Sequence, residues 1–132
     1  MGTWGNRNFE NDSAMDFVAD FIDNPSLESL EEPLTTVMSL SEEEEYIEVD
    51  EAGAALAAAE IVAAILAKPS VDFPSTLRAA IAPLHSSVSL QKLARKAVKQ
   101  ILKESELQEL FAESGEPSDW QDVQKDLIER LK

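Results

Sequence analysis

Apolar residues recur every three or four positions along most of the chain, which is the spacing of a helix with one buried face. After Asn11 or Asp12, either of which can cap a helix, the residues Ala14, Phe17 and Phe21 follow this spacing. No alternating run is long enough to predict a β-strand. We expect a first helix that ends at Asn24-Pro25, further helices at about residues 26–40, 51–68, 75–82 and 89–104, a short helix between Ser105 and Gly115, and a last helix that starts at Pro117. Pro33 falls inside the second helix and is expected either to kink it or to delay its start.

The stretch from Glu51 to Lys68 is apolar almost all round and rich in alanine. Helices of this kind are buried, and small side chains let neighbouring helices approach closely. The stretch is short for a membrane span, and Glu60 interrupts it. We therefore predict an all-α single domain over residues 1–132, a bundle of six or seven helices around this central Ala-rich helix. Because a buried carboxylate must be paired or protonated, Glu60 is expected to meet Arg95, Lys99 or a Trp indole.

Two segments outside the helices carry their own signals. Residues 1–10 contain Trp4 and Phe9, two large apolar groups whose exposure to water is unfavourable, so we predict an ordered N-terminal arm packed on the core. Residues 41–49 contain the run Glu42, Glu43, Glu44 and Glu45, whose mutual repulsion predicts a surface loop.

Charge is divided unevenly along the chain. The net charge of the 132 residues is −15, and residues 1–51 hold 15 acidic side chains and one basic one. Residues 73–103 hold six basic side chains and no acidic one. This balance argues against a general affinity for nucleic acid or for anionic membranes. It favours a basic protein partner for the N-terminal half.

Signals of catalysis are missing from the sequence. It contains no glycine-rich phosphate loop, no GxSxG and no HExxH motif, and no cysteine is present to act as a nucleophile or metal ligand. The single histidine, His85, stands beside serines without a nearby carboxylate, so we interpret it as an exposed or locally hydrogen-bonded side chain. We expect no enzymatic activity, no cofactor and no metal site. The N-terminus shows no signal peptide, and we expect a cytoplasmic protein.

The candidate partner-binding residues are the carboxylates that share a helix face or the acidic loop. They are Asp16, Asp20 and Asp23 on the first helix and Glu42, Glu43, Glu44 and Glu45 in the loop. A row of carboxylates at helical pitch matches lysine and arginine side chains of a partner. A solvated surface that only keeps the protein soluble is the alternative. The basic stripe Lys92, Arg95, Lys96, Lys99 and Lys103 lacks aromatic neighbours for stacking on bases, so its partner is expected in the acidic half of the same molecule or of a second copy.

The opening string MGTWGNRNFENDSAMDF resembles the start of a bacterial family of small proteins of unknown function. The matching positions are Met1, Gly2, Trp4, Gly5, Phe9, Asn11, Asp12, Ala14, Asp16 and Phe17, and the resemblance continues through residues 46–65 and 105–120. It implies a helical fold and no established activity. Small acidic proteins of this kind include immunity proteins encoded beside bacterial toxins.

Two classes of function follow. The first is an immunity protein that binds and neutralises a cognate toxin, such as a nuclease, whose basic active-site cleft attracts an acidic surface. The second is a small enzyme or regulatory domain of unknown chemistry that uses buried carboxylates. A toxin gene immediately upstream favours the first class, and a metabolic operon favours the second.

Overall fold

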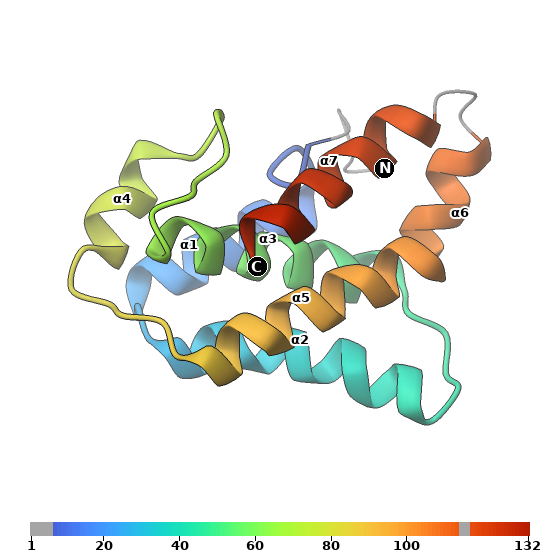
Figure 1. The fold of residues 1–132 in the computed structure, drawn as a ribbon, viewed down its shortest axis with the longest axis horizontal. Coiled ribbons are helices and arrows are strands. Elements are labelled where there is room, and N and C mark those ends of the chain that lie inside the picture. Colours follow the sequence, from blue (N-terminus) through green and yellow to red (C-terminus); the bar gives the residue numbers. More distant parts are fainter. Residues whose placement is uncertain (1–6, 114–116) are drawn as a thin grey trace.

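The computed structural model describes residues 7–113 and 117–132, and within them the chain forms seven helices and no β-strand (Figure 1). The helices are α1 (Asp12–Asp23), α2 (Leu27–Glu42), α3 (Val49–Ile65), α4 (Ser75–Ile81), α5 (Val88–Lys103), α6 (Glu106–Glu113) and α7 (Pro117–Arg130). The predicted all-α single domain is confirmed. No helix in the described part of the chain has the length and apolarity needed to cross a membrane.

The Ala-rich helix α3 is the centre of the bundle, as predicted. It packs against all six other helices, most extensively against α1, α2 and α5 (Figure 1). Every residue from Ala55 to Ala63 is buried, including Leu56 and Ile61. Alanine on every face gives α3 no single apolar stripe, and its neighbours can therefore surround it at close range.

Side-chain caps start several helices where the sequence indicated. The N–H of Ala14 donates to Asn11 Oδ1 at 2.8 Å at the start of α1, and the N–H of Ser29 donates to Ser26 Oγ at 3.2 Å at the start of α2. Ser105 Oγ likewise accepts from the N–H of Gln108 at 3.1 Å before α6. Each cap satisfies a backbone donor that the first turn of a helix leaves without an intrahelical partner.

The start of α3 and the end of α2 differ from the prediction. Glu48 caps α3 through a capping box in which its own N–H donates to Glu51 Oε2 at 3.1 Å, while Asp50 lies inside the first turn. Helix α2 continues through Glu42, so the acidic loop comprises residues 43–48 instead of 41–49. Pro33 does not delay α2, because the helix is already formed from Leu27.

The described part of the N-terminal arm packs on the core. Phe9 is 6% exposed, and its ring meets the ring of Phe73 edge to face at a centroid distance of 5.8 Å. Asn8 is also buried. Trp4, the other predicted anchor of the arm, and Gly115, the predicted end of the sixth helix, lie outside the described residues.

A buried polar network joins this arm to α3 and α7. Glu60, only 1% exposed, accepts from Asn8 Nδ2 at 2.8 Å and from Arg130 Nη1 and Nη2 at 2.8 and 3.3 Å. Asn8 and Gln124 exchange two further hydrogen bonds of 2.7 and 3.1 Å. Burial lowers the pKa of Arg130, but the carboxylates of Glu60 and Asp126 outweigh it, and this pKa is raised.

The buried Glu60 is therefore paired, although not by a predicted partner. Arg95 and Lys99, two of the predicted partners, do not bind Glu60, and of the two Trp indoles that of Trp4 lies outside the described residues. Arg95 Nη1 donates to the carbonyl of Leu131, and Lys99 is exposed. Arg130 lies 70 residues after Glu60, so no local spacing indicated this pair. Both oxygens of Glu60 accept hydrogen bonds within this network, which ties α3 to α7 and to the N-terminal arm.

Candidate partner-binding cleft

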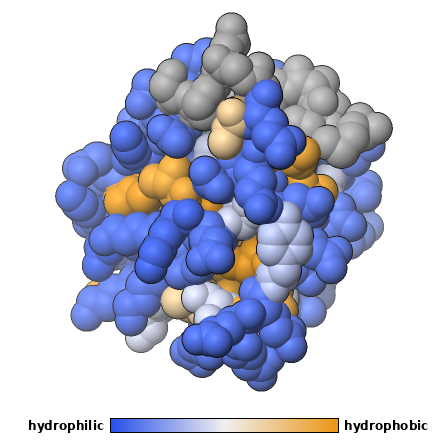
Figure 2. Space-filling model, turned by 90° about the vertical axis from the view of Figure 1, so that its right-hand side faces the viewer, coloured by the Kyte–Doolittle hydropathy of each residue, from blue (hydrophilic) through white to orange (hydrophobic). Residues whose placement is uncertain are grey.

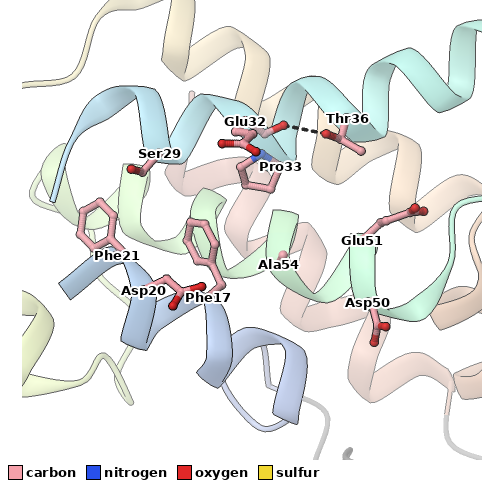
Figure 3. A pocket seen from close by; sticks show the side chains of 10 residues that line it. All are labelled: Phe17, Asp20, Phe21, Ser29, Glu32, Pro33, Thr36, Asp50, Glu51 and Ala54. Carbon is pink, nitrogen blue, oxygen red and sulfur yellow. Dashed lines mark hydrogen bonds between the residues drawn. The ribbon is translucent and has the colours of Figure 1, made fainter. Parts of the chain in front are cut away.

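A cleft of about 410 Å³ lies between α1, α2 and the first turns of α3 (Figure 3). Its lining residues are Phe17, Asp20, Phe21, Ser29, Glu32, Pro33, Thr36, Asp50, Glu51 and Ala54. Asp20 and Phe17 extend from α1, and Glu32 and Pro33 face them from α2 (Figure 3). Four carboxylates from three helices therefore surround one opening.

None of these carboxylates meets a cation within the described part of the chain. The four ion pairs found there join Arg7 to Asp72, Arg130 to Glu60 and to Asp126, and Lys132 to Glu129. Asp50 accepts a hydrogen bond of 2.8 Å from Ser13 Oγ, and Glu51 accepts from the N–H of Glu48. The carboxylates of Asp20 and Glu32 make no hydrogen bond in this part of the protein. The cleft is consequently a region of uncompensated negative charge.

The apolar side of the cleft consists of aromatic rings, a proline and an alanine. The rings of Phe17 and Phe21 stack at a centroid distance of 6.4 Å and an interplanar angle of 24°. Phe21 is buried in the core, while Phe17 is half-buried and borders the opening. A cation attracts both carboxylates and the face of an aromatic ring, so this arrangement suits the guanidinium of arginine or the ammonium of lysine.

The structure brings only one of the predicted partner-binding residues to this cleft. All seven predicted residues are exposed, but Asp20 alone lines the cleft, whereas Asp16 and Asp23 lie elsewhere on α1. Sequence reasoning missed Glu32, Asp50 and Glu51. Each belongs to a separate local pattern, and the sequence carries no signal of which helix faces meet.

The remaining predicted residues lie at the far end of α2. Glu42 closes that helix, and Glu43, Glu44 and Glu45 begin the loop that leads to α3. Figure 2 shows this end of the molecule, where hydrophilic side chains cover most of the face and hydrophobic ones appear only in the gaps between them. The acidic run is therefore a second negative surface, separate from the cleft residues.

Contacts with α6 hold the acidic loop in place. The hydroxyl of Tyr46 donates to the carboxylate of Glu109, and the N–H of Val49 donates to Glu106 Oε1 at 2.8 Å. The hydrogen bond to Glu109 is the main cause that raises the pKa of Tyr46 to about 12, and the negative charges of α6 add to it. The N–H of Glu106 in turn donates to the carbonyl of Ile47 at 2.9 Å. The loop thus presents its glutamates from a backbone that is fixed at its C-terminal side.

The basic stripe is exposed on α5 and does not pair with the acidic half. Lys92, Lys96, Lys99 and Lys103 form no ion pair among the described residues. Within the described residues these lysines thus make no ion pair with the acidic half, although Lys103 lines a pocket together with Glu44 and Glu45. The opposite charges therefore come close at one place, where the last turn of α5 borders the acidic loop.

The region around His85 contains local hydrogen bonds. Ser87 Oγ caps α5 by accepting from the N–H of Leu90 at 3.1 Å, and Ser86 Oγ donates to the carbonyl of Ser87. His85 itself is exposed. Over residues 7–113 and 117–132, no three histidine, aspartate or glutamate side chains converge as metal ligands.

Comparison with known proteins gives the family of the chain. No curated protein and no solved structure matches it. The family model described as a domain of unknown function (DUF4259) matches residues 2–123, a stretch that includes every residue of the cleft and precedes Gln124 and Arg130. Because this match spans most of the 132 residues, the chain belongs to the DUF4259 family.

Proposed function

We propose that this protein binds a basic protein partner through its acidic half, with the cleft between α1, α2 and α3 as the anchor point. The observation that carries the proposal is the cleft itself, where the carboxylates of Asp20 and Glu32 lie near the half-buried ring of Phe17 and make no ion pair or hydrogen bond with any described residue. Unpaired like charges destabilise a fold by repulsion, so a partner that neutralises them gives a physical reason for their presence.

The cleft and the acidic loop serve different steps of binding. Exposed charges at the rim of an interface act mainly on the rate of association, because they steer a partner of opposite charge over distances of about 10 Å. Glu42, Glu43, Glu44 and Glu45 suit this steering role. The cleft suits retention, since a guanidinium seated between Asp20 and Glu32 and over Phe17 is partly desolvated and forms charge-assisted hydrogen bonds.

The partner we propose is a toxin, with this chain acting as its immunity protein. A nuclease toxin must attract phosphate and therefore has a basic active-site cleft. A protein whose first 51 residues carry 15 acidic side chains presents a field similar to that of the nucleic acid and covers that cleft. The test of this assignment is co-expression with the product of the gene immediately upstream, followed by co-purification and by assay of the toxin activity in the complex.

Binding kinetics test the role of the acidic loop. The variant with glutamine at positions 42, 43, 44 and 45 should associate about tenfold more slowly than the wild type at low salt and at about the same rate at high salt. Its dissociation rate should change little. An association rate equal to that of the wild type at low salt removes the loop from the interface.

A second pair of variants tests the cleft. Asp20→Asn combined with Glu32→Gln keeps the shape of the cleft and removes two charges, and it should raise the dissociation rate about tenfold or more. The matched control is Glu28→Gln combined with Glu31→Gln, which removes two exposed charges from α2 outside the cleft. Equal dissociation rates for the two double variants contradict the cleft as the anchor.

A further inference from the structure

A second pocket, of about 360 Å³, lies at the opposite edge of the bundle from α6, between the end of α3 and the short helix α4 (Figure 1). Its lining residues are Ala64, Ile65, Pro69, Phe73, Arg78, Ile81, Ala82, Leu84 and His85. Seven of the nine are apolar. The two polar residues are Arg78 and His85. The guanidinium of Arg78 has only N–H donors, and the imidazole of His85 has at least one N–H donor.

Arg78 is a cation without an acidic partner. None of the ion pairs within the described part of the protein includes it, and residues 73–103 contain no carboxylate at all. Its guanidinium carbon lies 5.8 Å from the centroid of the Phe73 ring, which supports the side chain at the pocket wall. Phe73 is itself buried against Phe9, so the support is rigid. In a protein of net charge −15, an unpaired arginine held in this way gives the pocket a local positive charge.

Exposed apolar side chains occur in the loop before α4 and at the first residue of α5. Val71 precedes the pocket residue Phe73 and is 90% exposed, and Val88 follows His85 and is 67% exposed. They are two of the four large hydrophobic residues that are exposed in the described chain. Neither valine lines the pocket, and the apolar side chains that do line it favour a ligand whose body is also apolar.

We infer that this pocket binds a small ligand that carries one carboxylate on an apolar body. The guanidinium of Arg78 recognises the carboxylate by paired hydrogen bonds, and an N–H of His85 can donate to the same group. The apolar residues of α3, α4 and their loops receive the body of the ligand. The volume lies at the lower end of the range for small-molecule sites, which limits the ligand to the size of a medium-chain fatty acid or a single amino-acid derivative.

A carboxylate fits this pocket better than a phosphate does. A phosphate ester carries up to two charges and three strong acceptor oxygens, and among the lining residues only Arg78 carries a permanent positive charge. The seven apolar side chains supply no donor for the other phosphate oxygens, so a phosphate gains less from this site than a carboxylate does. This site is independent of the acidic cleft, and its ligand has the opposite charge.

The experiment uses octanoate as the probe and the full-length protein. Titration is followed by isothermal calorimetry and by the amide resonances of the pocket residues in two-dimensional NMR spectra. We expect saturable binding to the wild type, with shifts confined to the end of α3, α4 and the loops around it. Arg78→Gln should weaken binding about tenfold or more, because a charge-assisted pair is lost. Arg78→Lys should have an intermediate effect, because it keeps the charge and loses the planar fork.

Controls distinguish a specific carboxylate site from nonspecific hydrophobic binding and from nonspecific attraction of anions. Lys96→Gln removes an exposed cation outside the pocket and should leave the affinity for octanoate unchanged. Octan-1-ol, which keeps the apolar body without the charge, should bind at least about tenfold more weakly. Equal affinity of octanol and octanoate, equal affinity of wild type and Arg78→Gln, or competition by inorganic phosphate at the same concentration as octanoate overturns the proposal. Arg78 is exposed, and its replacement removes only the contact of its guanidinium with the Phe73 ring, so helical circular dichroism is used to check that each variant is folded.

Discussion

Replacing Arg130 by methionine removes the cation that neutralises Glu60 while keeping an unbranched apolar stem of similar length. In the wild type the guanidinium binds both oxygens of Glu60, and among residues 7–113 and 117–132 the one other donor to that carboxylate is Asn8. Glu60 is 1% exposed at the centre of α3, so its charge has no route to water. The variant therefore leaves a buried carboxylate with a single neutral hydrogen bond.

The expected loss of folding stability follows from the burial of the Arg130–Glu60 ion pair. Removing one partner of a buried ion pair costs about 3–5 kcal/mol, because the other charge stays uncompensated. The side chain of Arg130 is 15% exposed, and water can reach part of the vacated space, so the lower end of this range applies. We expect Arg130→Met to lower the free energy of unfolding by about 3 kcal/mol, which for a domain of this size corresponds to roughly 10 °C in melting temperature.

Urea unfolding followed by helical circular dichroism measures the effect, with an unchanged slope as evidence that the variant still unfolds in two states. Asp126→Asn is the matched control, since it removes the exposed carboxylate that pairs with the same arginine, and it should cost at most about 0.5 kcal/mol. The double variant Glu60→Leu/Arg130→Met should be more stable than Arg130→Met alone, because no unpaired charge remains. A loss below about 0.5 kcal/mol in Arg130→Met, or additive losses in the double variant, refutes the reasoning.

Three further predictions rest on other parts of the structure. Gly53→Ala should lower the free energy of unfolding by about 1 kcal/mol, because the new Cβ would lie 3.0 Å from the Asn11 oxygen that caps α1. This crowding outweighs the better helix propensity of alanine, and a higher melting temperature of the variant contradicts the prediction. Leu56→Asp should leave the chain unfolded at 25 °C by placing an unpaired charge at the centre of α3, and a normal circular dichroism spectrum and melting curve contradict the central position. Tyr46 is the only tyrosine, so absorbance titration should give its pKa as about 12, above the ordinary 10.0, and Glu109→Gln should return it toward 10.0. The stability that this hydrogen bond contributes is present below pH 10.0 and is lost as the pH rises through about 12. An unchanged pKa of Tyr46 in the Glu109→Gln variant excludes Glu109 as the main cause of the shift.

The helices were predictable because their signals are local. The spacing of apolar residues and the caps at Asn11 and Ser26 determine where helices begin, and each signal acts within a few residues. The central position of α3 was also readable, since a helix that is apolar on all faces has no side to turn to water. The start of α3 was harder to predict. Aspartate is a good N-cap residue, which favours Asp50, but the structure uses a capping box of Glu48 and Glu51 instead.

The candidate site was predictable only in its charge. Composition alone identified the acidic half and its exposed residues, and Asp20 was among them. The cleft itself depends on how α1 and α2 pack on α3, which brings Glu32 opposite Phe17. Residues that belong to different helices have no fixed relation along the sequence, so no periodicity reports their meeting.

The amino-acid sequence by itself determined the helices, the buried centre and the division of charge, because helix propensity, capping and hydrophobic burial act through near neighbours or through composition. Only the tertiary structure decided which long-range partners meet. Glu60 needed a partner by physical necessity, but its identity depended on the path of α7, which carries Arg130 back to the middle of α3. The same holds for Arg78, which makes no ion pair with any described residue, because only the packing of the helices decides which carboxylates come within reach of its guanidinium.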